Sequence, residues 1–234
     1  MADQPPYVWE NIWRSDVYND PGERLRRAQR RLTALRELTG TTRALRDVVE
    51  FGCGEGSLAR GIADPAWGVR SYRGIDRSET AIHRATSLTP APDKFAFTRS
   101  DVFDADVAPN SADTVIACGL LEHLPRAREA LEKFHATCRP DALLILTMSN
   151  VFSAMYFNRN VRQAVGRWPY GYQRNYSPSR LRGLLSEFFS VEKLTVAQGD
   201  SDHPIATAFD MAGRRVSGLV GRYLHVIATP KGKP

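Results

Sequence analysis

The residues best suited to chemistry lie in a glycine-rich segment near residue 50. The run from Val48 to Phe51 predicts a short buried strand, and Gly52, Gly54 and Gly56 follow it at alternate positions. Glycines allow the backbone to turn sharply and to approach a ligand with no side chain between. In an open α/β sheet, ligands bind beyond the carboxyl ends of the strands, near the point where the strand order reverses. The segment therefore predicts a ligand-binding turn after a first strand.

Two acidic residues follow the next two predicted strands. Asp76 ends a strand predicted over residues 71–75, and Asp101 comes just after one predicted over residues 95–98. A carboxylate at the end of the second strand can accept hydrogen bonds from the two hydroxyls of a ribose. We therefore expect a nucleoside at the glycine-rich turn.

The charge and spacing of the glycines indicate which nucleotide the turn serves. A dinucleotide fingerprint has the spacing G-x-G-x-x-G and presents backbone amides to a pyrophosphate. Here the spacing is G-x-G-x-G, and Ser57 stands where the last glycine of that fingerprint would fall. Glu50 and Glu55 would repel a pyrophosphate but favour a cationic ligand. S-adenosylmethionine fits, because it carries a sulfonium, an ammonium and a ribose.

Several segments in series resemble motifs of the class I, Rossmann-like S-adenosylmethionine-dependent methyltransferases. Glu50–Gly56 resembles the first motif of that family, Gly74–Asp76 its second-strand motif, and Asp101–Val102 the pair that holds the adenine. Residues 113–124 are similar to the fourth strand and its loop, and residues 139–143 to the turn before the fifth strand. The resemblance covers Arg46 to about Asn150, nearly half of the chain.

The resemblance implies a methyl donor, a fold and a set of cofactor contacts. Asp141 and Ala142 replace two family glycines in the turn before the fifth strand, which touches no cofactor contact. The residues expected to bind the cofactor S-adenosylmethionine are Glu50, Gly52, Cys53, Gly54, Gly56, Asp76, Arg77, Asp101, Val102 and Cys118.

Apolar runs alternating with helical stretches predict an α/β fold with a doubly wound, mostly parallel sheet. The expected strands cover residues 48–51, 71–75, 95–98, 114–118, 142–148, 191–196 and 223–228. The resemblance implies seven strands with the last one antiparallel. The expected helices cover residues 57–63, 79–87, 126–138 and 177–188.

The chain outside the motifs predicts accessory elements around one domain. Residues 1–40 are interpreted as an N-terminal helical cap, whose main helix starts at Asp20 and stops at Gly40. Its early aromatic residues either fold over a ligand cleft or attach the N-terminus to the core: Tyr7, Trp9, Trp13 and Tyr18. Residues 41–234 form the methyltransferase domain, with lid insertions at about 151–176 and 199–220.

Methyl transfer from a sulfonium requires alignment of the acceptor and, for an alcohol or amine, removal of a proton. His123 follows the predicted fourth strand and is the first candidate base, with a packing role as the alternative. His203, in the polar connection between the last two strands, is the second. No His, Asp and Glu cluster has metal-ligand spacing, so we expect no metal.

The aromatic segment 151–176 is the best candidate for binding the acceptor. Flat rings with polar tips suit a small organic molecule, and an arginine could meet a carboxylate or phosphate. The expected substrate-binding residues are Tyr170, Tyr172, Tyr176 and Arg174. The alternative is that several of these rings pack accessory helices onto the sheet.

Composition excludes several classes of protein. The chain has 234 residues, of which 42% are hydrophobic and 25% charged, as in ordinary globular proteins. It has no long apolar run, so we expect no membrane-spanning helix. Its three cysteines form no CxxC pair, which favours a reducing cytoplasm. The net charge of +6 is spread along the chain, which argues against a nucleic-acid partner.

Together these observations predict a cytoplasmic enzyme of secondary metabolism that methylates O or N of a small-molecule acceptor. One alternative is a methyltransferase acting on RNA or protein through the arginine-flanked helix of residues 20–40. Others are an NAD-dependent oxidoreductase and a non-catalytic subunit that binds S-adenosylmethionine. The acceptor and the oligomeric state are left open.

Overall fold

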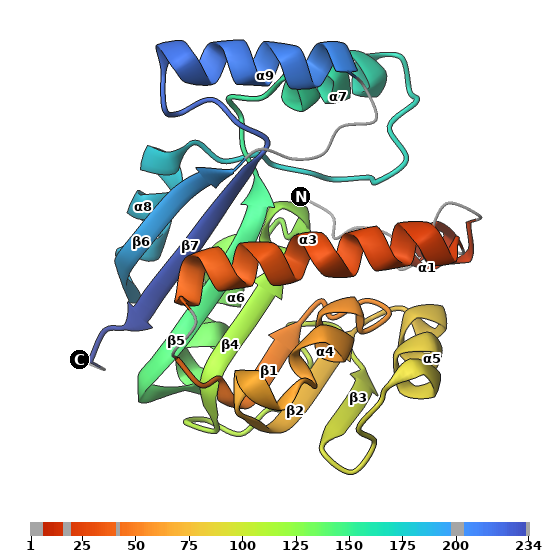
Figure 1. Ribbon diagram of the computed structural model, residues 1–234, viewed down its shortest axis with the longest axis vertical. Coiled ribbons are helices and arrows are strands. Elements are labelled where there is room, and N and C mark those ends of the chain that lie inside the picture. Colours follow the sequence, from red (N-terminus) through yellow and green to blue (C-terminus); the bar gives the residue numbers. More distant parts are fainter. Residues whose placement is uncertain (1–6, 16–19, 41–42, 198–203, 233–234) are drawn as a thin grey trace.

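The computed structural model of the chain describes residues 7–15, 20–40, 43–197 and 204–232. One sheet has the strand order β3-β2-β1-β4-β5-β7-β6 (Figure 1). Strand β7 runs antiparallel to both neighbours, and the other pairs are parallel. The strands are β1 (Arg46–Phe51), β2 (Val69–Asp76), β3 (Phe95–Arg99), β4 (Ala112–Cys118), β5 (Cys138–Ser149), β6 (Phe189–Ala197) and β7 (Tyr223–Pro230). The predicted seven-stranded α/β sheet with an antiparallel last strand is confirmed.

Helices lie along the sheet and beyond its carboxyl edge. They are α1 (Tyr7–Arg14), α3 (Pro21–Thr39), α4 (Ser57–Ile62), α5 (Glu79–Leu88), α6 (Ala127–Thr137), α7 (Ala154–Ala164), α8 (Pro178–Leu185) and α9 (Pro204–Val216), with 3-10 turns η1 (Pro65–Trp67) and η2 (Leu121–His123). Helix α3 has the predicted ends. The Asp20 carboxylate accepts a hydrogen bond from the Gly22 amide at 2.9 Å, and Gly40 follows the last turn with φ of +70°.

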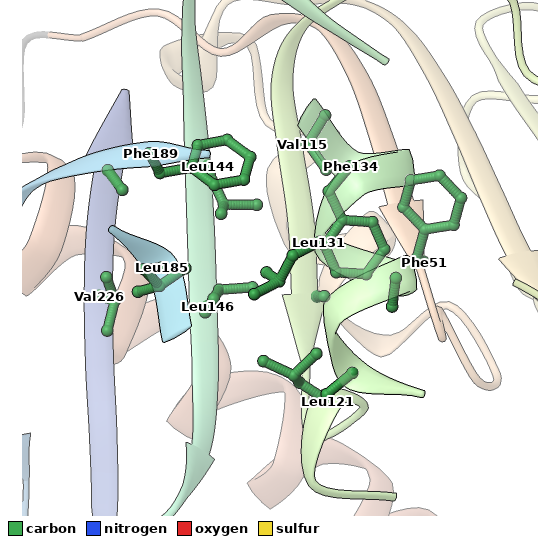
Figure 2. Packing of buried hydrophobic residues seen from close by; sticks show 14 of the residues in the cluster. Phe51, Val115, Leu121, Leu131, Phe134, Leu144, Leu146, Leu185, Phe189 and Val226 are labelled. Atoms are coloured by element: carbon green, nitrogen blue, oxygen red, sulfur yellow. The ribbon is translucent and has the colours of Figure 1, made fainter. Parts of the chain in front are cut away.

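The hydrophobic core covers both faces of the sheet, because neighbouring residues of a strand point to opposite sides. On β4, Val115 packs with α6 and α8, whereas Ile116 packs with α3 and α4. Figure 2 shows the first of these two clusters, in which the Phe51 ring stacks on Phe134 with centroids 4.8 Å apart. Helices on both faces hold the carboxyl ends of the strands at a common edge.

Strand β5 corrects one expectation from the sequence. Residues 139–143, predicted as a turn, lie inside β5. Ala112 pairs with Cys138 and Thr114 with Leu143, so the register shifts between these two pairs. The absence of the family glycines agrees with this result, since the extra residues are accommodated as an irregularity in an extended strand rather than in a tight turn.

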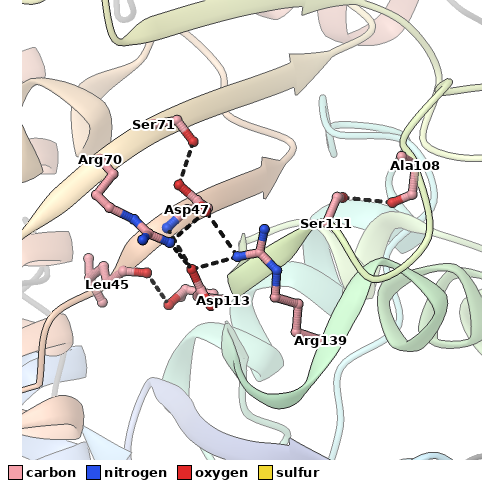
Figure 3. Close-up of polar contacts among 9 residues, drawn as sticks. Leu45, Asp47, Arg70, Ser71, Ala108, Ser111, Asp113 and Arg139 are labelled. Carbon is pink, nitrogen blue, oxygen red and sulfur yellow. Dashed lines mark hydrogen bonds and ion pairs between the residues drawn. The ribbon is translucent and has the colours of Figure 1, made fainter.

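An ion-pair network joins the amino ends of the central strands (Figure 3). Arg70 of β2 and Arg139 of β5 each contact both Asp47 of β1 and Asp113 of β4, at distances of 2.7 to 2.9 Å. The Ser71 hydroxyl also donates to Asp47. This network therefore links four strands at the edge opposite their carboxyl ends.

Two helices lie together beyond the carboxyl edge of the sheet, away from the other helices (Figure 1). Helix α7 falls in the segment 151–176 and α9 in the segment 199–220, both predicted as lid insertions. The Asp210 carboxylate accepts a hydrogen bond from the Ala154 amide at 2.8 Å, which attaches α9 to the start of α7. No helix within the described ranges has the length and apolar character to cross a bilayer.

Candidate functional site

The glycine-rich turn between β1 and α4 has a conformation that requires glycine. Gly52, Gly54 and Gly56 have φ values of +73°, +56° and +70°. Side chains with a Cβ seldom adopt this left-handed region. The amides of Gly52 and Cys53 both donate to the carbonyl oxygen of Ile75, at 2.7 and 3.0 Å. The turn is thereby fixed against the end of β2.

Asp76 lies beside this turn, as the sequence predicts. Its carboxylate accepts hydrogen bonds from the amides of Gly54 and Ser78, both at 2.9 Å. Burial raises the pKa of Asp76, and these two hydrogen bonds oppose that effect. Asp101 lies at the end of the neighbouring strand, where it accepts from the Phe103 amide at 3.1 Å and lies 3.8 Å from Arg77.

A cavity of about 1480 Å³ opens at this edge of the sheet. Most of the predicted cofactor residues line it, namely Gly52, Asp76, Arg77, Asp101, Val102 and Cys118. The others lie behind the lining, namely Glu50, Cys53, Gly54 and Gly56. Burial raises the pKa of the Cys118 thiol to about 12, so this thiol is protonated at neutral pH.

The two glutamates of the turn do not present their carboxylates to the cavity, contrary to the sequence argument. Glu50 is fully buried and accepts a hydrogen bond from the Tyr72 hydroxyl. Burial raises the pKa of Glu50 to about 7. Glu55 is buried too and lies 3.8 Å from Arg60. Both side chains point into the protein, because the strand and the turn direct them away from the open edge.

Helix α1 covers the glycine-rich turn. The Trp13 ring lies so close to Gly54 that a Cβ there would approach it to 2.6 Å. Trp9 meets the His123 ring edge-on, with centroids 4.7 Å apart, and both tryptophans line the cavity. The sequence left open whether the early aromatic residues fold over a ligand cleft or attach the N-terminus to the core. Trp9 and Trp13 lie over a cleft. The Tyr7 side chain and Tyr18 lie outside the described residues.

Helix α1 is attached through Glu10. Its carboxylate accepts hydrogen bonds from the Ser78 hydroxyl at 2.7 Å and from the Thr80 hydroxyl, at the start of α5. Burial acts to raise the pKa of Glu10, but the hydrogen bonds from Thr80 and Ser78 outweigh it and lower the pKa to about 2. Glu10 is therefore ionised at neutral pH and holds α1 against the domain.

Arg31 of α3 belongs to the site, although the sequence did not single it out among the arginines that flank this helix. Its guanidinium donates to the Ser57 hydroxyl at 3.0 Å and lines the cavity. Burial raises the pKa of Glu50 and of Asp76, and the positive charge of Arg31 opposes that rise at both residues. An amphipathic pattern could not distinguish Arg31 from the other arginines of α3. The pattern shows which face of a helix is polar, but it does not show which residues of another element lie against that face.

His123 follows β4 and lines the cavity. Its Nδ1 lies 3.0 Å from the carbonyl oxygen of Tyr172. Since a carbonyl accepts, the neutral ring carries its proton on Nδ1 and keeps a lone pair on Nε2. Burial lowers the pKa of His123 to about 4, so the ring is neutral at pH 7. His203 lies outside the described residues.

Glu122 is a site residue that the sequence reasoning named only as part of a motif. It is buried, lines the cavity and accepts hydrogen bonds from the Ser149 amide and hydroxyl at 3.1 and 3.2 Å. Its Oε2 has no hydrogen-bond partner among the described residues. Burial raises the pKa of Glu122 to about 7.

The predicted acceptor residues divide into two groups. Tyr170 lines the cavity with Trp168, and their ring centroids lie 5.0 Å apart. Tyr176 lies in the hydrophobic core, 1% exposed. Tyr172 and Arg174 do not line the cavity, and the Arg174 amide donates to the Glu122 carbonyl at 2.7 Å. Tyr176 packs in the core, as the packing alternative expects, and the side chains of Tyr172 and Arg174 are partly buried outside the cavity lining.

Further polar side chains line the cavity near Tyr170 without having been singled out from the sequence. They are Arg159, Arg162, Gln173 and Asn175. Arg159 lies on α7, and no motif or spacing in its neighbourhood distinguishes it from the exposed arginines around it. The described residues contain no group of three or more His, Cys, Asp and Glu side chains placed to hold a metal ion.

Comparison with known proteins agrees with this geometry. A family model described as a methyltransferase domain matches residues 23–197. A putative methyltransferase of Haloferax volcanii, solved with the Trm112 methyltransferase activator, is similar in structure with a TM-score of 0.73 and 18% identity over 99% of this chain and 100% of that one. None of the curated proteins matches the chain in sequence.

Two further solved structures share the fold. The N-methyltransferase NodS of Bradyrhizobium japonicum, in complex with S-adenosyl-L-homocysteine, has a TM-score of 0.66 and 17% identity, covering 97% of this chain and 99% of that one. A possible histamine N-methyltransferase of Thermotoga maritima has a TM-score of 0.65 and 16% identity, covering 95% and 99%. The chain therefore belongs to the methyltransferase domain family, with the fold of the class I enzymes whose methyl donor is S-adenosylmethionine.

Proposed function

We propose that this enzyme transfers the methyl group of S-adenosylmethionine to an oxygen or nitrogen atom of a small-molecule acceptor. The observation that carries the proposal is one cavity that extends from Asp76 and Asp101 to His123, Tyr170 and Arg159. Cofactor and acceptor sites that share one cavity allow the two reactants to be aligned for transfer.

The residues at one end of the cavity fit the cofactor. In the proposal, Asp76 accepts from the ribose hydroxyls, and Asp101 and Val102 hold the adenine. The Gly52 backbone approaches the ligand without a side chain, and Arg31 binds the carboxylate of the methionine portion. When bound, the cofactor supplies an electrophilic methyl group on a sulfonium.

In the proposal, His123 is the base that removes the proton of the acceptor. Its Nδ1–H donates to the Tyr172 carbonyl, which leaves Nε2 available to accept a proton. The Trp9 edge contact and the Tyr172 hydrogen bond fix the ring on both sides. A neutral imidazole at pH 7 follows from its lowered pKa of about 4. His203, the other candidate base, lies outside the described residues and is given no role.

The size of the acceptor is inferred from what covers the cavity. Trp13 of α1 lies over the glycine-rich turn at the cofactor end. At the other end, Trp9 contacts the rings of His123 and Tyr170, and Trp168 packs on Tyr170. A small organic molecule can enter such a space, whereas an RNA or a folded protein would need α1 displaced. The names of two similar structures, both N-methyltransferases or possible ones, agree with a nitrogen acceptor.

A fractionation experiment tests the acceptor class. The protein and methyl-labelled S-adenosylmethionine are incubated with the low-mass metabolites, the RNA and the protein of a cell extract, each separately. We expect label in the low-mass fraction. Label confined to the RNA or protein fraction would overturn the small-molecule assignment and favour the alternative acceptor class.

Asp76→Asn tests the cofactor site. The amide keeps the shape of the side chain but loses the charge that strengthens two hydrogen bonds to the ribose, and its NH2 group cannot accept from the Gly54 or Ser78 amide as a carboxylate oxygen does. Since a hydrogen bond to a charged group contributes about 1–1.5 kcal/mol more than one to a neutral group, we expect S-adenosylhomocysteine to bind roughly 100-fold more weakly. Isothermal calorimetry measures this, with Asp93→Asn as an exposed control. Unchanged affinity would remove the ribose role of Asp76.

A further inference from the structure

One charged side chain at the acceptor end of the cavity is buried without an opposite charge. Arg159 of α7 is 7% exposed and yet lines the cavity. Its guanidinium donates to the Gln173 carbonyl at 2.6 Å, to Asn175 Oδ1 at 3.0 Å and to Asn160 Oδ1 at 2.8 Å. All three acceptors are neutral, so these bonds hold the group in place but do not neutralise it.

The hydrogen bonds leave part of the guanidinium unused. An arginine has five N–H donors, of which Nη1 uses two and Nη2 uses one. Nε has no partner among the described residues, and Nη2 keeps a second hydrogen. Two adjacent nitrogens of a guanidinium match the two oxygens of a carboxylate or phosphate. Arg159 therefore retains the donors that such a group requires.

The Tyr156 ring lies 4.9 Å from the guanidinium carbon of Arg159, but an aromatic ring does not replace an opposite charge. Within the described part of the chain, no carboxylate forms an ion pair with Arg159, and burial lowers its pKa. Buried charges in proteins are normally paired, because removing an isolated charge from water costs several kcal/mol. A ligand that brings a negative charge would reduce this cost.

The acid of the neighbouring helix α9, Asp210, accepts a hydrogen bond from the Ala154 amide and does not line the cavity, whereas several arginines do. Arg162 of α7, Arg214 of α9 and Arg222 before β7 line the same cavity. The acid nearest this end among the lining residues is Glu122, whose raised pKa of about 7 keeps much of it neutral. The positive charge of Arg159 also contributes to the lowered pKa of His123, which places the guanidinium near the proposed base.

We propose that Arg159 binds an anionic group, a carboxylate or a phosphate, on the methyl acceptor. The inference rests on the proposed function, since it places the acceptor at this end of the cavity. Arg159 is a binding residue that selects and orients the acceptor, with its oxygen or nitrogen toward His123. The structure of α7 and the segment 173–175 provides the rigid support that orientation requires.

The test measures binding of three matched aromatic probes to the complex with S-adenosylhomocysteine: benzoate, phenyl phosphate and the neutral benzamide. A ring is chosen because Trp168 and Tyr170 line this part of the cavity. We expect one of the anions to bind at least about tenfold more tightly than benzamide, as a charge-assisted hydrogen bond predicts. Preference for benzoate indicates a carboxylate, and preference for phenyl phosphate indicates a phosphate.

Substitutions identify the residue responsible. Arg159→Gln should abolish the anion preference, and Arg159→Lys should weaken it because the charge remains but the planar fork is lost. Arg167→Gln removes the same charge from an exposed position that does not line the cavity, and should leave the preference intact. Thermal unfolding verifies that each variant is folded, and Arg159→Lys serves if Arg159→Gln does not fold.

Two results would overturn the inference. One is a wild-type protein that binds S-adenosylhomocysteine but shows no preference for either anion over benzamide. The other is a preference that persists unchanged in folded Arg159→Gln or, if that variant does not fold, in Arg159→Lys. Failure of the wild-type protein to bind S-adenosylhomocysteine would instead contradict the proposed function, so the two failures are distinguishable.

Discussion

The two edges of the sheet use charged residues in opposite ways. At the amino edge, Asp47, Asp113, Arg70 and Arg139 pair with one another near solvent, and every charge has an opposite neighbour (Figure 3). At the carboxyl edge, Glu50, Glu122 and Arg159 are buried, and each keeps an atom without a hydrogen-bond partner among the described residues.

This difference separates groups that serve the fold from groups that serve a ligand. Exposed, mutually satisfied ion pairs add little stability and little chemistry. Buried groups with unmet hydrogen bonds cost stability, and proteins retain such groups mainly at functional sites. The three predictions below test the contrast, from the largest expected effect to the smallest.

Buried glutamates at the carboxyl edge should destabilise the protein as the pH rises. The pKa of Glu50 and of Glu122 is raised from 4.5 to about 7, so the folded state holds a proton that the unfolded state has lost in this window. Relative to Glu50→Gln or Glu122→Gln, the wild-type protein should lose about 3 kcal/mol of unfolding free energy per residue between pH 4.5 and 7. Urea unfolding across this range measures the difference.

His123 and His225 affect the pH dependence of stability in the opposite direction. They are present in both the variant and the wild type, so the comparison removes their effect. Their pKa values are lowered to about 4, so their contribution to stability is lost as the pH falls below 6.5. Asp47 is the matched control from the amino edge. Its pKa is lowered, because the hydrogen bonds and charges of Arg139, Ser71 and Arg70 outweigh burial, so its contribution is lost only as the pH falls below 3.8. If the difference in unfolding free energy between Glu50→Gln and the wild type did not change with pH, the contrast between the two edges of the sheet would be contradicted.

Glu10→Gln tests the attachment of α1 over the site. The substitution removes the charge from hydrogen bonds to Ser78 and Thr80, and we expect α1 to lose about 1–2 kcal/mol of protection. Hydrogen exchange of α1 amides, compared with those of α5, measures this. Glu79→Gln is the control, because Glu79 lies at the start of α5, is 73% exposed and pairs with Arg99. In the wild type, the pKa of about 2 predicts that the attachment is lost as the pH falls from 4.5 through 2.

Arg70→Gln should have the smallest effect. The side chain of Arg70 is 62% exposed, and Arg139 continues to pair with both aspartates. We expect a loss of less than about 1 kcal/mol and no change in binding of S-adenosylhomocysteine. Calorimetry and urea unfolding of the same preparation measure both quantities. A loss of several kcal/mol would show that the amino edge stabilises the fold more than exposed ion pairs normally do.

Much of the fold could be predicted from the sequence, because the responsible interactions are local. Alternating apolar runs predicted the strands, and Asp20 and Gly40 marked the ends of α3 by capping chemistry. The spacing of Gly52, Gly54 and Gly56 predicted a sharp turn, and the structure shows that all three have positive φ. The placement of Asp76 beside that turn followed from the rule that parallel strands share their carboxyl edge.

The environment of individual side chains could not be predicted in the same way. Tyr176 and Arg174 belong to the expected aromatic segment but point away from the cavity, and Arg31 looked like any other arginine of α3. Neither residue type nor spacing distinguishes Arg159 and Glu122 from other charged residues of the chain. Their burial depends on residues more than ten positions away, which no local pattern records.

The sequence by itself determined the order of the elements, the conformation of the glycine-rich turn and the family, since these depend on backbone sterics and on hydrophobic periodicity. Tertiary structure alone decided which charges are in contact with solvent, which are paired and which are isolated. Glu50 is turned inward beside Tyr72, and Arg159 is buried among neutral acceptors. The reason is physical: the energy of a charge depends on the dielectric and the partners around it, and packing of distant segments creates both.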